Sequence, residues 1–141
     1  MLAGMLAAPL APAFAQFRVE VSGVGLTQLP IAIAPFRGEE QSPQKISAIV
    51  RADLERSGQF RGIDASGVAL DETSHPDVSA WRQKGADSLA VGSVTLLPNG
   101  RFDVRFRLWD VVRGQDLGGQ SYAVVAGDLR LAAHRIADYI Y

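Results

Sequence analysis

The protein has 141 residues, a formal net charge of −1, 48% hydrophobic residues and 21% charged residues. This length and balance are typical of one globular domain with a core of its own. The near-zero charge excludes the basic field that nucleic-acid binding needs. The sequence contains no cysteine, which excludes disulfides, thiol nucleophiles and thiolate metal sites.

Residues 1–15, MLAGMLAAPLAPAFA, carry no charged side chain. They end on Ala-Phe-Ala, the small-residue pattern that signal peptidase cleaves, although no basic residue precedes the apolar run. Two prolines in this segment argue against a buried helix. The sequence therefore predicts a signal peptide, complete or truncated, over residues 1–15, with Gln16 as the first mature residue and export as its consequence.

The next segment alternates apolar and charged residues, which predicts a strand with Phe17, Val19 and Val21 on one face. Gly23 and Gly25 follow it and would form a hinge. A strand at a chain end is held by few contacts. It is therefore either an edge strand of this domain or a strand that pairs with another protein.

Residues 29–35, LPIAIAP, form a short apolar run between prolines, which favours a buried strand. Ser42-Pro43 predicts the start of a helix, because serine caps free N–H groups and proline fits the first turn. Its apolar stripe is Ile46, Ile49, Val50 and Leu54. Gly58 would end the helix in a left-handed conformation.

A short strand over residues 60–63 and a loop over 64–77 follow in the sequence. Asp77 or Ser79 would cap a short helix that continues through Trp81 and ends at Gly85. Residues 88–97 predict a long strand, and the Asn-Gly pair at 99–100 predicts a hairpin turn.

The return strand alternates cleanly, with Phe102, Val104, Phe106 and Leu108 on one face and charged residues on the other. A looser turn over 113–119 leads to a strand over 120–125. Asp128 would cap the last helix, whose apolar face is Leu129, Ala132, Ala133, Ile136, Ala137 and Ile140. The order predicts a single α/β (α+β) domain: a mixed β-sheet with helices packed mainly on one face.

The side chains that could perform chemistry are few. His75 lies in a polar loop, and His134 lies off the apolar face of the last helix, one turn from Asp138, a spacing that a helical ion pair explains as well as a functional site does. Neither histidine has the neighbouring ligands of a metal site. The sequence lacks a G-x-S-x-G nucleophile elbow and a dinucleotide fingerprint. It therefore predicts no catalytic, cofactor-binding or metal-binding residue.

A nucleic-acid surface is also not indicated. Arg101, Arg105 and Arg107 lie on the strand face opposite Phe102 and Phe106, whereas a stacking platform needs aromatic and basic groups on one face. Trp109 falls on the arginine side. It is either an exposed contact residue or, as we favour, packs over the arginine side chains.

Several stretches resemble, in their order and spacing, the family of TolB N-terminal domains of the Tol–Pal cell-envelope system. The resemblance covers about residues 17–141. The stretches are PIAIAPF (30–36), IVRADLERSGQF (49–60), WRQKGADSLAVGSV (81–94), PNGRFDVRFRLWDV (98–111), QSYAV (120–124) and LRLAAHRIADYIY (129–141).

The resemblance implies a periplasmic, non-catalytic interaction module that supports outer-membrane integrity and constriction during cell division. Residues 29–141 would be the α/β domain, and the β-propeller that holds Pal in this family would lie beyond Tyr141. Residues 16–28 would be the partner-binding segment. The positions that match the strand bound by the C-terminal domain of TolA are Gln16, Phe17, Arg18, Val19, Glu20, Val21 and Ser22.

Two other functions compete with this one. The IAIAPF stretch and the following helix are also similar to accessory subunits of other outer-membrane-linked assemblies, although many of these are lipoproteins and this chain has no cysteine. A hydrolase that uses His134 and Asp138 is the third candidate. It is the weakest, because no nucleophile or orienting group is placed beside them.

Overall fold

The computed structural model describes residues 27–141. Their helices and strands follow the order β1 (Leu29–Ile33), η3 (Glu39–Gln41), α2 (Ile46–Arg56), β2 (Phe60–Ile63), α3 (Val78–Gln83), β3 (Ser88–Leu96), β4 (Phe102–Asp110), β5 (Gln115–Val124), η4 (Ala126–Asp128) and α4 (Leu129–Ile140). None of the helices in this range is both long and apolar enough to cross a membrane.

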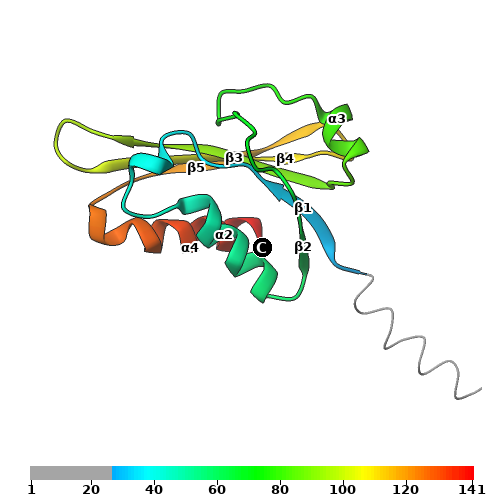
Figure 1. Ribbon diagram of the computed structural model, residues 1–141, viewed down its shortest axis with the longest axis horizontal. Helices are drawn as coiled ribbons and strands as arrows, with labels where there is room; N and C mark the ends of the chain where they lie inside the picture. Colours follow the sequence, from blue (N-terminus) through cyan, green and yellow to red (C-terminus); the bar gives the residue numbers. More distant parts are fainter. Residues whose placement is uncertain (1–26) are drawn as a thin grey trace, which may run out of the picture.

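The strands form a five-stranded mixed sheet in the order β2-β1-β3-β4-β5 (Figure 1). Strand β1 runs parallel to both of its neighbours, β2 and β3. Strands β3, β4 and β5 form an antiparallel meander. The two outer strands of the described sheet are therefore β2, with four residues, and β5, with ten.

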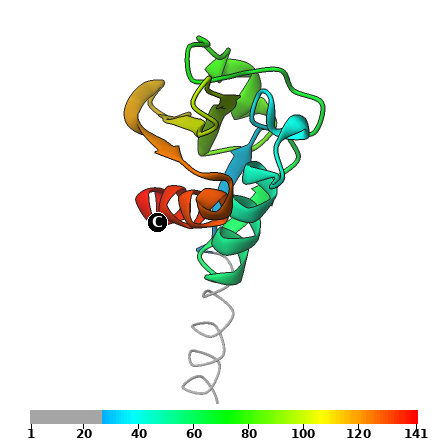
Figure 2. The same ribbon diagram turned by 90° about the vertical axis from the view of Figure 1, so that its left-hand side faces the viewer.

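Helices α2 and α4 lie side by side on one face of the sheet, and α3 with the long loop before it lies on the other (Figures 1 and 2). The main core fills the space between the sheet and the α2–α4 pair. Its largest fully buried members include Phe36, Phe106, Ile31, Ile33, Ile46, Leu54, Leu129 and Ile136. The predicted fold class, a mixed sheet with helices mainly on one face, is confirmed.

A second, smaller core lies on the opposite face of the sheet. Its buried members are Ala32, Ala34, Ala65, Trp81, Ala86, Leu89, Val91 and Val111. Trp109 is half-buried against this cluster, so it is a packing residue that does not project into solvent. The cation–π contact on this face is made by Lys84, whose Nζ lies 4.5 Å from the ring centre of Trp81.

Helix α2 begins at Ile46, later than the Ser42-Pro43 pair predicts. The reason is Glu39, a buried carboxylate of η3 that accepts hydrogen bonds from the backbone N–H (2.9 Å) and the Oγ–H (2.6 Å) of Ser47. It satisfies a free donor at the helix start from outside the helix. The Ser42 hydroxyl instead accepts from the N–H of Gln44 and forms a local turn.

Two further boundaries differ from the predicted ones. Strand β5 begins at Gln115, not at residue 120, because a tight turn with Gly114 at φ 69° lets the ladder resume at once. Asp128 precedes α4 as predicted but makes no side-chain capping bond, since the chain enters α4 from a 3-10 turn. The predicted Asp77 cap and the left-handed Gly58 are confirmed.

Candidate functional site

The predicted partner-binding residues 16–22 and the hinge glycines Gly23 and Gly25 lie outside the described residues. The structure does describe the point where the chain enters the domain. Gln28 donates from Nε2 to the carbonyl of Gly58 (3.2 Å), and the N–H of Leu29 donates to the carbonyl of Gln59 (2.9 Å). These bonds attach the first described residues to the turn that connects α2 and β2.

The surface around this entry point is partly apolar. The side chain of Leu29 is half exposed, and its register partner on β2 is Phe60. The ring of Phe60 meets the ring of Tyr141 edge to face, with centres 6.3 Å apart. Both ends of the described chain, the start of β1 and Tyr141, thus lie beside β2. The first residues of β1 and the last residue of the chain therefore lie at one end of the domain.

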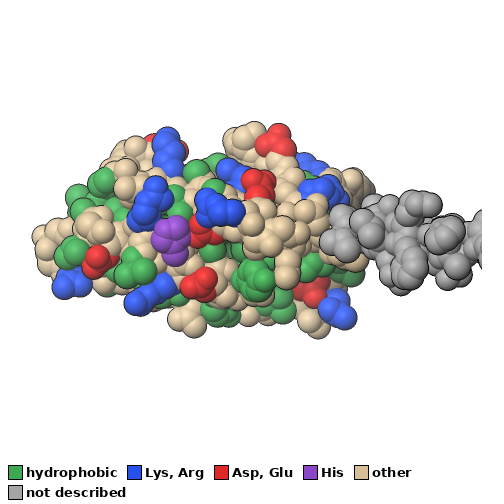
Figure 3. Space-filling view, turned by 90° about the horizontal axis from the view of Figure 1, so that it is seen from below, with side chains coloured by type: hydrophobic (Ala, Val, Ile, Leu, Met, Phe, Trp, Pro, Cys, Tyr) green, Lys and Arg blue, Asp and Glu red, His purple; other side chains and the backbone are tan. Residues whose placement is uncertain are grey.

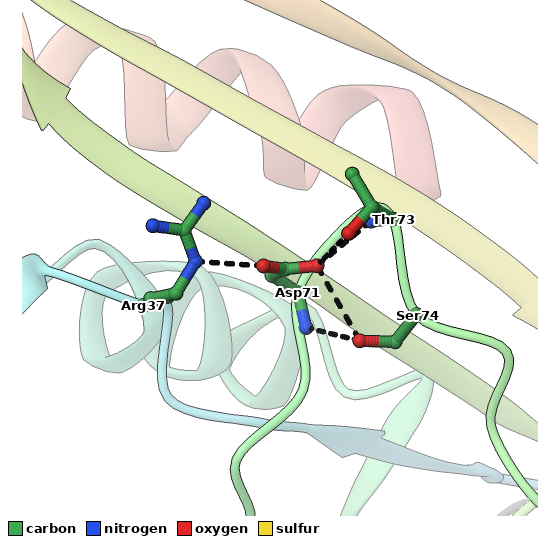
Figure 4. Close-up of polar contacts among 4 residues, drawn as sticks. All are labelled: Arg37, Asp71, Thr73 and Ser74. Carbon is green, nitrogen blue, oxygen red and sulfur yellow. Dashed lines mark hydrogen bonds and ion pairs between the residues drawn. The ribbon is translucent and has the colours of Figure 1, made fainter.

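A groove of about 490 Å³ lies between the segment after β1 and the loop over residues 67–74. Arg37 crosses it and donates from Nε to Oδ2 of Asp71 (2.6 Å) (Figure 4). The other carboxylate oxygen of Asp71 accepts from the N–H (2.8 Å) and the hydroxyl (2.6 Å) of Thr73. The N–H of Asp71 donates to Oγ of Ser74 (2.9 Å).

These contacts determine what the groove can do chemically. The hydrogen bond from Thr73, together with that from Arg37, lowers the pKa of Asp71 from 3.8 to about 2 even though burial opposes the shift. A carboxylate with so low a pKa is a poor proton acceptor at neutral pH. The network holds the loop over residues 67–74 to the segment that follows β1, which is a structural contribution.

The partner of His134 is not Asp138, one turn away on the same helix, but a residue of α2. The Nδ1 of His134 contacts Oδ2 of Asp53 on α2, and Asp53 also accepts a bond from Arg56 (2.9 Å). Burial raises the pKa of Asp53, but the hydrogen bonds from His134 and Arg56 outweigh it and hold the pKa below its ordinary value. Figure 3 shows this face, with a histidine among acidic and basic side chains. The contact joins two helices and presents no nucleophile.

The remaining candidate side chains do not converge. His75 is exposed in the loop before α3. Within residues 27–141 no three histidine or acidic side chains are grouped so that they could hold a metal ion. Arg105 and Arg107 instead form ion pairs with Asp103 (2.8 Å) and Asp116 (2.6 Å).

The sequence did not predict the contact between Asp53 and His134, although a signal for it existed. Asp53 directly precedes Leu54, and His134 directly follows Ala133, so each flanks the buried stripe of its helix. Residues beside a buried stripe lie at the boundary with the neighbouring element. Two complementary side chains in that position are candidates for a bond between helices.

The family model of the TolB amino-terminal domain matches residues 17–117. Among curated proteins, the chain is 72% identical over 141 residues to the Tol-Pal system protein TolB of Albidiferax ferrireducens. It is 71% identical over 137 residues to that of a Polaromonas species, with 100% and 97% of the chain covered. In both comparisons it spans 32% of the relative, about one third of its length.

Two solved structures share the fold. A crystal structure of TolB from Acinetobacter baumannii superposes with a TM-score of 0.68 at 29% identity, over 81% of this chain and 27% of that one. A PelC dodecamer from Paraburkholderia phytofirmans superposes with a TM-score of 0.50 at 14% identity, over 81% of this chain and 86% of that one. At 14% identity, the similarity to PelC shows a shared fold and nothing about function.

Proposed function

Because the chain belongs to the family of TolB amino-terminal domains, we propose that it is a non-catalytic interaction module of the Tol–Pal system in the periplasm. In this proposal residues 1–15 are a leader, and residues 16–22 form a strand that binds the C-terminal domain of TolA by strand addition. The observation that carries the proposal is the 72% identity to a Tol-Pal system protein TolB over the whole chain.

The relatives are about three times as long as this chain, so their full set of partners is not assigned to it. We propose that Pal is bound by a propeller that lies outside residues 1–141. The domain then contributes the TolA contact and, through it, supports outer-membrane integrity and constriction at division.

The position of β1 is compatible with a strand that is donated to a partner. Both sides of β1 are already paired, one with β2 and the other with β3. Residues 16–22 are thus not needed to complete the centre of the sheet. Their alternation suits strand addition, in which main-chain bonds give affinity and every second side chain gives specificity. Phe17, Val19 and Val21 would enter the partner's pockets.

The test is a titration of the chain with the C-terminal domain of TolA. Deletion of residues 16–22 is expected to abolish binding, and Val19→Asp to weaken it by at least roughly tenfold, because a charge would enter an apolar pocket. Glu20→Thr is the matched control, because Glu20 would lie on the solvent-facing side of the added strand, and it should change the Kd by less than about twofold. Undiminished binding after the deletion would reject the strand-addition mechanism.

A further inference from the structure

Strand β5 is an outer strand of the described sheet, with β4 as its one paired neighbour there. It is ten residues long, and residues 117–125, LGGQSYAVV, contain no charged residue and no proline. Natural sheets usually protect such an edge with lysine, proline or a short strand. β5 has no lysine and no proline, although a register shift interrupts its ladder with β4 between Arg107 and Trp109, and the carbonyl of Ala123 accepts a hydrogen bond from Nη1 of Arg101 (3.3 Å). Its length still suits pairing with another strand.

Helix α4 lies beneath this edge and presents one row of exposed side chains along it. The row is Leu131, Arg135 and Tyr139, at a spacing of four residues. At one end, Leu131 and Arg135 line a small groove of about 120 Å³ together with Tyr122 and Val124 of β5. At the other end, the hydroxyl of Tyr139 donates to the carbonyl of Leu117 (3.3 Å). The row therefore lies beneath β5, with Leu131 beside Val124 at one end and the long side chain of Tyr139 reaching the carbonyl of Leu117 at the other.

The spacing of this row matches an added strand. Four residues of helix advance by about 6.0 Å, and two residues of strand by about 6.8 Å. Every second side chain of a strand placed outside β5 would thus lie over Leu131, then Arg135, then the exposed part of Tyr139, whose ring also packs against that of Phe106 on β4, with centres 5.0 Å apart.

The charges of the row define the partner further. Arg135 is exposed and forms no ion pair within residues 27–141. Asp128 lines the groove at the Leu131 end. A complementary strand therefore presents, on one face, a basic, an apolar, an acidic and an apolar side chain in that order.

We propose that the outer edge of β5 in the described sheet and the row on α4 form an acceptor site for an extended segment of a partner protein with this alternation. The site is separate from residues 16–22, which are proposed to be donated to TolA, and it does not depend on that function. It accepts a strand, whereas those residues donate one.

The probe is the synthetic peptide acetyl-Lys-Thr-Val-Thr-Glu-Thr-Val-amide, written for antiparallel addition. Binding to the full 141-residue chain is measured by isothermal titration calorimetry, and hydrogen exchange is followed across β5. We expect saturable binding and slowed exchange of the amides of residues 117–124. A scrambled peptide of the same composition is the control for nonspecific association and should bind at least roughly tenfold more weakly.

Arg135→Glu should weaken binding of the probe by about tenfold, because like charges would then face each other. Arg130→Glu makes the same charge change on the same helix, on the side of His134, and should alter the Kd by less than about twofold. Equal effects of the two variants, or unchanged exchange in β5, would overturn the proposal.

Two further outcomes identify other occupants. If the peptide binds only after deletion of residues 1–26, the chain's own N-terminus occupies the edge. If exchange in β5 is slow without peptide and becomes faster on dilution, a second copy occupies it. Either result would also overturn the proposal.

Discussion

The imidazole Nδ1 of His134 on α4 contacts the Oδ2 of Asp53 on α2, and so joins the two helices that cover the main core. The two residues are 81 positions apart in the sequence. The carboxylate is mostly shielded, at 17% side-chain exposure, whereas the imidazole is 43% exposed. The bond therefore lies at the rim of the helix pair, where it stabilises their packing without being fully desolvated.

His134→Ala is expected to lower the free energy of unfolding by about 1 kcal/mol, the range for a partly exposed charge-assisted bond. Urea unfolding measures the loss. Asp138→Asn on the same helix is the control and should change it by less than about 0.3 kcal/mol. A double-mutant cycle of Asp53→Asn with His134→Ala should be non-additive. Full additivity would mean that the contact contributes nothing.

The Asp71 network makes the domain sensitive to acid. The folded-state pKa of Asp71 is about 2, below its ordinary value of 3.8. The stabilisation is therefore fully present above about pH 4 and is lost as the pH falls toward 2. Asp71→Asn should reduce the difference between the free energies of unfolding measured at pH 6 and at pH 2.5. If the variant shows the same difference as the unmodified protein, Asp71 does not have this role.

Gly92 on β3 is required by close packing. A Cβ at this position would lie 2.7 Å from a ring carbon of the buried Phe36 and would also meet the carbonyl oxygen of Arg105. Gly92→Ala should destabilise the fold by about 3 kcal/mol, as overpacking does. Gly127→Ala is the matched control, because no atom lies within 4 Å of its Cβ position. Thermal unfolding of both variants checks this, and equal melting temperatures would disprove it.

Glu39 is expected to be more important for stability than its neighbour Glu40. Glu39 is 5% exposed and accepts two hydrogen bonds from Ser47 at the start of α2, whereas Glu40 is exposed. Glu39→Ala should cost about 2 kcal/mol, the range for bonds to a charged group. Glu40→Ala should cost less than about 0.5 kcal/mol. Similar losses in the two variants, measured by urea unfolding, would contradict the capping role.

Local patterns determined most of the elements. The stripe from Ile46 to Leu54, the alternation from Phe102 to Leu108 and the glycine at 100 each depend on neighbours within a few residues. The spacing of apolar residues and the residue types in a turn can both be read from a few neighbouring positions of the sequence. The boundaries were less accurate because distant groups set them, as the buried Glu39 does for α2. The strand over residues 17–21 stays a prediction.

Tertiary structure alone decided which side chains meet. The sequence placed His134 opposite Asp138 because it shows only neighbours on the same helix, whereas packing of α4 on α2 gave it Asp53. Arg37 and Asp71 likewise meet through the positions of two loops. Within residues 27–141, β5 lies above Leu131 and Arg135 as an outer strand only because the sheet order places it there. Sequence periodicity assigns faces to each element, but the order of strands and the pairing of helices depend on the packing of the whole chain.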